Sequence, residues 1–100
     1  MKNQNRHSLF YVYMIRCCDG SLYTGYTSDL ERRIKEHGSS RGAKYLRGKM
    51  PLNLVWYKEY KYLKKALQME TKIKKLTKKE KESIVGGKRL DKVFKLKKKI

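Results

Sequence analysis

The sequence predicts a small α+β domain in which helices flank a three-stranded, mostly antiparallel sheet. Two observations carry this prediction: an early pair of strand-like segments joined by a turn signal, and later segments that begin with helix-capping residues. The chain has 100 residues, enough for one domain with a modest core. The expected order of elements is β-β-α-α-β-α-α.

The first two strands are expected over residues 9–17 and 21–26, which are rich in β-branched and aromatic side chains. Asp19-Gly20 between them is a strong turn signal. The loop length sets the register, and the sequence allows two. A two-residue loop pairs Tyr13 with Tyr26, whereas a three-residue loop closed by the same glycine in the left-handed conformation shifts the pairing by one. The second register places four residues on one face: Tyr11, Tyr13, Tyr23 and Gly25.

The next two elements are a helix and a third strand. Ser28 and Glu31 have the spacing of a capping box, so a helix is expected over about residues 29–37. The polar, basic connection that follows contains glycines and an expected helical turn at 43–47. Residues 52–60 alternate like a strand that begins after a proline.

The last part of the chain is expected to be helical. The longest helix is predicted over residues 62–76, and Thr77 and Glu80 form a second capping-box spacing for a short helix that ends at Gly86-Gly87. The predicted organisation is therefore a flexible arm over residues 1–8, one domain over 9–85, and a basic tail or partial helix over 86–100.

The charge of the chain points to a polyanionic partner. There are 27 Lys and Arg against 9 Asp and Glu, a net charge of +18. Nucleic acid is the leading candidate, with ribosomal RNA and an anionic membrane surface as competitors. No apolar run approaches the ~18 residues of a membrane span, and the first eight residues lack the apolar stretch of a signal peptide. Cys17 and Cys18 are adjacent and provide neither a disulfide staple nor a metal knuckle, so we expect a reduced, cytoplasmic protein, associated with the nucleoid if bacterial.

Glu70 is the exception to this charge. It is the one acid between Lys61 and Lys79, and it falls within the apolar stripe of the helix predicted over residues 62–76. A carboxylate that faces the body of the protein needs a cation, which is either an arginine or Mg²⁺. Arg33, one helical turn before His37, is either the partner of Glu70 or a phosphate clamp. The predicted stripe consists of Leu63, Ala66, Leu67, Ile73 and Leu76.

Together these residues resemble the GIY-YIG nuclease superfamily, in particular its small stand-alone bacterial group. The resemblance covers about residues 9–85. It departs from the family pattern at Tyr11, where the first signature has glycine, at Thr24, where the second has Ile or Val, and at Tyr26, where some relatives have lysine. The ordered motifs are Tyr11-Val12-Tyr13, Tyr23-Thr24-Gly25, Leu30-x-x-Arg33-x-x-x-His37, and Glu70 followed by Ile73-Lys74-x-Leu76.

The resemblance implies metal-dependent cleavage of phosphodiester bonds. Tyr13 and Tyr23 match the signature tyrosines, and one of them is expected to be the general base as a phenolate. Both must then share a face, which selects the three-residue hairpin loop. Arg33 matches the catalytic arginine and His37 an auxiliary position. Glu70 matches the metal-binding glutamate and is expected to hold Mg²⁺ or Mn²⁺, weakly without substrate. Gly25 matches the glycine of the second signature.

The expected partner is DNA, branched or damaged, with RNA as an open possibility and with no membrane or obligate protein partner; a monomer is expected. The expected activity is that of a structure-preferring endonuclease with little sequence specificity, in repair or recombination. The alternative is a non-catalytic RNA- or ribosome-associated protein on the same fold. The residues expected to bind nucleic acid are Tyr26, Arg41, Lys44, Tyr45, Arg47, Lys49 and Lys74.

Overall fold

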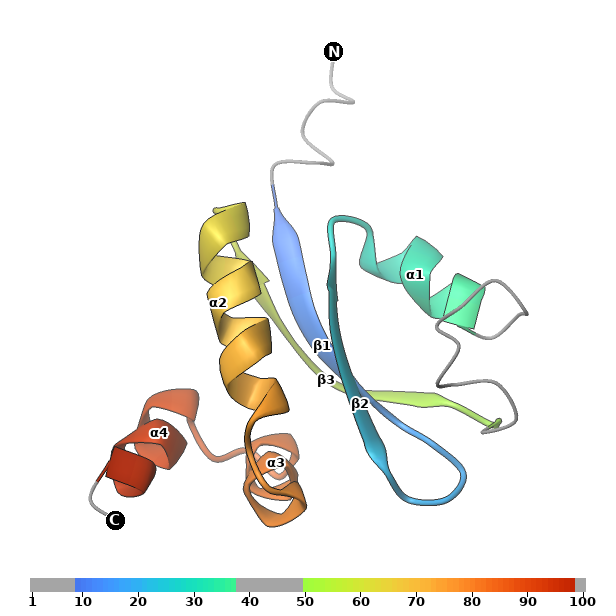
Figure 1. Ribbon diagram of the computed structural model, residues 1–100. Helices are drawn as coiled ribbons and strands as arrows, with labels where there is room; N and C mark the ends of the chain where they lie inside the picture. Colours follow the sequence, from blue (N-terminus) through green and yellow to red (C-terminus); the bar gives the residue numbers. More distant parts are fainter. Residues whose placement is uncertain (1–8, 38–49, 99–100) are drawn as a thin grey trace.

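The computed structural model describes residues 9–37 and 50–98 (Figure 1). Its antiparallel sheet has the strand order β2-β1-β3, and α1 lies on one side of it while the other helices lie on the opposite side. The predicted α+β class is confirmed. The arm over residues 1–8 and the helical turn predicted at 43–47 lie outside the described residues. The elements are β1 (Phe10–Arg16), β2 (Leu22–Thr27), α1 (Leu30–His37), β3 (Asn53–Tyr60), α2 (Leu63–Lys74), α3 (Lys78–Val85) and α4 (Leu90–Lys98).

The hairpin between β1 and β2 has the three-residue loop. Tyr13 pairs with Gly25, and Ile15 pairs with Tyr23. The turn is closed by hydrogen bonds from the Gly20 N–H to the Cys17 carbonyl and from the Cys17 N–H to the Ser21 carbonyl, both 2.9 Å. Gly20 has φ +87°, the left-handed conformation that closes such a loop. The register required for two tyrosines on one face is therefore confirmed.

The helix-capping predictions are right at one site and wrong at the other. Thr77 and Glu80 form the complete capping box of α3. At α1 the cap is Asp29, whose Oδ1 accepts from the Arg32 N–H at 3.2 Å. The predicted box beginning at Ser28 is wrong by one residue, because α1 starts at Leu30 and its N-cap position therefore falls on Asp29.

Alternation along β1 divides the core into two clusters. Val12 and Met14 face α2, α3 and α4, whereas Tyr13, Ile15 and Cys17 face α1. All five side chains are buried, as expected for the central strand of a sheet covered on both faces.

The apolar face of α2 is narrower than predicted. Ala66, Ile73 and Leu76 are buried, but Leu63 and Leu67 are 42% and 36% exposed, so their assignment to the core is wrong. At 100° per residue the buried side chains cluster on one face, and the two exposed leucines lie on the adjoining flank. Glu70 lies between that flank and the buried face, at the margin of the core rather than in its middle.

Helix α4 packs onto the same domain. Val93 on α4 is 4% exposed and belongs to the cluster formed with α2 and α3. Arg16 on β1 makes two 2.7 Å hydrogen bonds to the Glu82 carboxylate on α3, which ties the central strand to this helical end. Among the described residues, no helix has the length and apolarity to cross a membrane.

Candidate active site

Tyr13, on β1, lies in close contact with Gly25 on β2. A Cβ atom added to Gly25 would lie 2.6 Å from the Tyr13 hydroxyl oxygen and 2.8 Å from its Cζ. The aromatic ring therefore lies across the backbone of β2, where only glycine leaves room for it. The hairpin register is what sets these two residues opposite each other.

His37, at the end of α1, is a polar partner of Tyr13. Its Nε2 lies 2.8 Å from the Tyr13 hydroxyl, and both side chains are almost fully buried, at 2% and 1% exposed. The His37 ring also packs edge-on against Tyr23, with 5.5 Å between ring centroids. The imidazole is thus in contact with both tyrosines of the predicted site.

The protonation states of this pair follow from burial. Burial raises the pKa of Tyr13 to about 12, although a hydrogen bond with Arg33 acts in the opposite direction. Burial, and then the charge of Arg33, lower the pKa of His37. At neutral pH Tyr13 is therefore a neutral phenol that is hydrogen-bonded to a neutral imidazole. This differs from the expected phenolate, because loss of solvation outweighs the nearby positive charge.

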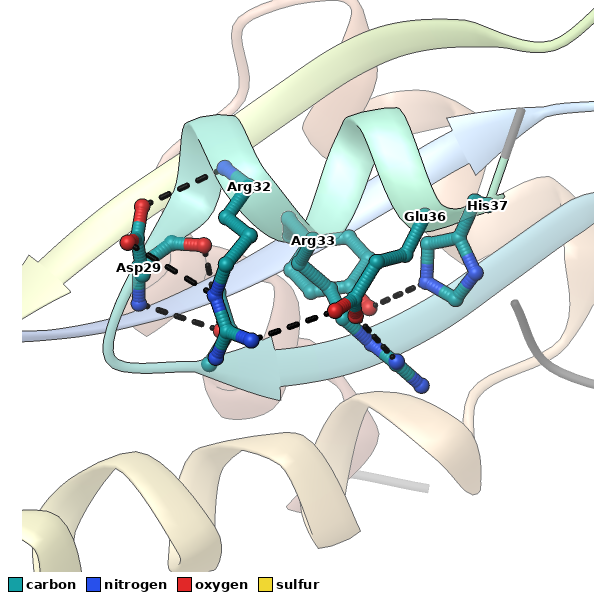
Figure 2. Close-up of polar contacts among 7 residues, drawn as sticks. Asp29, Arg32, Arg33, Glu36 and His37 are labelled. Atoms are coloured by element: carbon teal, nitrogen blue, oxygen red, sulfur yellow. Dashed lines mark hydrogen bonds and ion pairs between the residues drawn. The ribbon is translucent and has the colours of Figure 1, made fainter. Parts of the chain in front are cut away.

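Arg33 is held by its own helix. Its Nη1 lies 2.9 Å from Glu36 Oε1, and the other oxygen of Glu36 lies 3.2 Å from Arg32 Nη1 (Figure 2). The hydrogen bond that Arg33 donates to Glu36 is the main cause that raises the pKa of Arg33. The Arg33 side chain is 32% exposed, so its guanidinium remains accessible to an anion from solution.

Glu70 joins the site from α2. Its side chain is 14% exposed, and its Oε2 lies 3.2 Å from Lys74 Nζ one turn further along the helix. Within residues 9–37 and 50–98, the ion pair of Glu70 is with this lysine and not with an arginine. The charge of Glu70 contributes slightly to the raised pKa of Tyr13, so the carboxylate lies within electrostatic reach of the phenol.

The donor set at Glu70 suits a metal ion that shares its ligands with substrate. In residues 9–37 and 50–98, no three His, Cys, Asp or Glu side chains group as a metal cluster. A single carboxylate at the margin of the core fits Mg²⁺, which commonly takes one or two carboxylates and completes its shell with water and phosphate oxygens.

The residues predicted to bind nucleic acid do not lie together with Tyr13 in the described part of the chain, apart from Lys74, which pairs with Glu70. Tyr26 is 40% exposed and lies opposite Val12, on the other face of the sheet from Tyr13. Lys74 is 53% exposed and pairs with Glu70. Five predicted residues lie outside the described part of the chain: Arg41, Lys44, Tyr45, Arg47 and Lys49.

Glu36 is the residue of the site that the sequence prediction missed. It bridges Arg32 and Arg33, which precede it by four and three positions on α1. That spacing puts all three side chains on neighbouring positions of one helix face, so a search for charge pairs at these intervals would have found it.

Comparison with known proteins agrees with this geometry. Residues 9–83 match the GIY-YIG catalytic domain. A UPF0213 protein of Halalkalibacterium halodurans is 46% identical over 76 residues, which are 76% of this chain and 81% of that protein. A UPF0213 protein of Vibrio cholerae is 47% identical over 81 residues, 80% of each.

Two solution NMR structures share the fold. One, of a UPF0213 protein from Bacillus halodurans, has a TM-score of 0.53 and 45% identity, and the other, of a protein from E. faecalis, has a TM-score of 0.56 and 39% identity. Each alignment covers 78% of this chain and 83% of the other. The catalytic-domain match ends at residue 83, so α4 lies beyond it.

Proposed function

Because the chain belongs to the GIY-YIG family, a nuclease superfamily, and to its small UPF0213 group, we propose that it is a metal-dependent endonuclease that hydrolyses phosphodiester bonds in DNA. One observation supports the proposal: the buried Tyr13 contacts His37 and interacts electrostatically with the accessible Arg33 and the marginally buried Glu70. These are the groups that such hydrolysis needs, and they come from β1, α1 and α2.

The proton of the attacking water leaves through Tyr13 to His37. With a pKa of about 12, only roughly one Tyr13 in 10⁵ is a phenolate at pH 7, so the phenolate is not the resting base. Instead, the hydroxyl oxygen takes a proton from water while its own proton passes to Nε2 of His37, 2.8 Å away. As the water oxygen bonds to phosphorus, the bond to the leaving oxygen breaks and His37 becomes an imidazolium. The leaving oxygen keeps the electron pair of that bond and takes a proton from solvent.

The negative charge that develops on phosphate is met by Arg33, and Glu70 would hold a divalent cation beside it. Arg33 donates to the non-bridging oxygens, and Glu36 fixes its orientation until substrate binds. Glu70 would hold Mg²⁺ or Mn²⁺, which supplies Lewis-acid stabilisation of the leaving oxygen when bound. The present partner of Glu70, Lys74, is largely exposed and free to turn toward solvent or a phosphate.

The proposed substrate is branched or damaged DNA in repair or recombination, cut with little sequence preference. The net charge of +18 supports binding through phosphates, which carry no sequence information. Such binding weakens steeply as salt concentration rises.

A cleavage panel tests this proposal. The purified protein is incubated with labelled flap, branched, duplex and single-stranded DNA, with Mg²⁺, with Mn²⁺ and with EDTA. We expect EDTA-sensitive cleavage, at least about 100-fold slower for Arg33→Ala. The matched control is Arg32→Ala, which removes a 67% exposed arginine from the same helix and should cleave normally. Binding without cleavage of any substrate would contradict the proposal and favour the non-catalytic alternative.

A further inference from the structure

A second concave surface lies on the face of the sheet opposite Tyr13. It is a groove of about 1080 Å³ bounded by β3, α2 and the segment from α3 to α4. β3 is an edge strand, and α2 packs mainly over β1 and β2, so the α2 side of β3 is left for α4 to border. We call it the α4 groove, and its principal lining side chains are Trp56, Tyr60, Phe94, Lys58, Lys72 and Lys95.

The α4 groove combines aromatic rings with cations. Trp56, Tyr60 and Phe94 are each partly exposed. Lys58 Nζ lies 5.8 Å from the centroid of the Tyr60 ring, and Lys72 Nζ lies 5.7 Å from that of Phe94. Each of these two rings therefore has an ammonium group over its face.

Little negative charge opposes these cations. Asp91 is the one acidic residue among the described side chains that line the groove, and it is already paired with Arg89 at 3.3 Å. An occupant of the α4 groove therefore meets flat apolar rings and a positive potential together. This combination suits a ligand with planar aromatic groups joined by anions.

We propose that the α4 groove binds an unpaired stretch of nucleic acid. Lys58 and Lys72 turn from the ring faces to the flanking phosphates, which they hold together with Lys95, and bases stack on the aromatic rings. Every base offers a π face, and stacking on aromatic side chains beside a cationic track is the general means of holding single strands. In a duplex the base faces are covered by their neighbours. The inference rests on the proposed nucleic-acid substrate and adds a binding site separate from Tyr13.

The α4 groove depends on the part of the chain beyond the catalytic-domain match. Phe94 and Lys95 come from α4, which Val93 anchors in the core. The catalytic site comes from residues 9–83 and one wall of the groove from residues 88–95. In this proposal the C-terminal helix adds recognition of single-stranded nucleic acid on the face of the sheet opposite Tyr13.

Trp56 provides the test, because it is the only tryptophan of the chain. Its emission is followed in EDTA, where no cleavage occurs, while the full chain is titrated with a short oligothymidylate. We expect saturable quenching, with at least tenfold weaker binding of a blunt duplex and of an abasic oligomer of equal length. Phe94→Leu keeps an apolar side chain but removes the ring, and it should weaken binding about tenfold. Tyr62→Leu is the matched control, since it removes a 68% exposed ring from outside the groove, and its affinity should not change.

Two other outcomes of the titration would overturn the proposed binding site. Equal quenching by oligothymidylate, duplex and abasic oligomer would overturn the proposal, because it shows attraction to phosphates alone. Quenching by phosphatidylglycerol vesicles and not by oligothymidylate would overturn it in favour of a lipid surface. Lys72→Gln, at an exposed position, should weaken binding and its salt dependence even if Phe94→Leu fails to fold.

This test is separate from that of nuclease activity. Phe94→Leu should retain EDTA-sensitive cleavage of branched DNA while losing affinity for the oligothymidylate. If the wild type cleaves nothing but is quenched as expected, the binding site stands and the endonuclease proposal fails. If it cleaves but is not quenched by oligothymidylate, the endonuclease proposal stands and the binding site fails.

Discussion

Replacing Gly25 by alanine perturbs the site through a single methyl group. The new Cβ would lie 2.6 Å from the Tyr13 hydroxyl oxygen, so this oxygen must retreat by roughly 0.8 Å to reach ordinary contact at 3.4 Å. The ring is 1% exposed and has little space in which to move. Overpacking of this kind costs about 1–3 kcal/mol of unfolding free energy.

The same displacement should disrupt the 2.8 Å contact between Tyr13 and His37. A misplacement of about 1 Å in a catalytic group lowers rates by about 100-fold, and we expect that loss of cleavage in Gly25→Ala. Stability is measured by urea denaturation and cleavage by single-turnover kinetics. Gly86→Ala is the matched control, because its Cβ would meet no atom closer than 3.4 Å and its φ is −77°.

A double-mutant cycle with Tyr13→Ala tests the cause. In that background the ring is gone, so Gly25→Ala should cost less than about 0.5 kcal/mol. If Gly25→Ala destabilises the protein equally with and without the Tyr13 ring, the loss of stability does not come from a clash between the new methyl group and this ring.

Three further perturbations follow from the same structure. Because burial and the charge of Arg33 lower the pKa of His37 below 6.5, the neutral form of its imidazole persists at mildly acidic pH. The cleavage rate should therefore stay level down to pH 6.5 and fall only below it. A fall that begins above pH 7 would contradict proton transfer through Tyr13 to His37. Tyr60→Phe removes a buried hydroxyl that has no hydrogen-bond partner among the described residues. Urea denaturation should therefore show a gain of about 1 kcal/mol in the free energy of unfolding. A loss of that size would contradict the view that this hydroxyl is unpartnered. Lys74→Met removes the cation 3.2 Å from Glu70, so half-maximal cleavage should need a lower Mg²⁺ concentration. Lys75→Met is the control and should leave this concentration unchanged. A higher Mg²⁺ requirement in Lys74→Met would show that Lys74 assists metal binding instead.

Features that depend on nearby residues were predictable from the sequence. The capping box of Thr77 and Glu80 depends on four consecutive residues, and the structure has it as predicted. The hairpin was predictable except for its register, which needed the added requirement that Tyr13 and Tyr23 share a face. At α1, Ser28 and Asp29 are both good N-cap residues, and spacing alone chose the wrong one.

Features that depend on how elements pack were not predictable. Periodicity places Leu63 and Leu67 beside the buried positions of α2, but the position of the helix over the sheet decides which flank is covered. Burial of Tyr13, and so the upward shift of its pKa, needs the opposing Gly25 and the closure of α1 over it. The α4 groove needs β3 and α4 together, which lie about 30 residues apart in the chain.

The most direct test of the account is the rate of flap-DNA cleavage by the wild type and by Glu70→Gln, measured under single turnover with Mg²⁺. The substitution keeps the size of the side chain and removes only its charge, and Glu59→Gln makes the same change at an exposed position on β3. The proposed metal-dependent mechanism predicts that the cleavage rate falls at least about 100-fold in Glu70→Gln and does not fall in Glu59→Gln. It also predicts no cleavage by the wild type in EDTA. Equal rates for the wild type and Glu70→Gln, or cleavage that persists in EDTA, would contradict it.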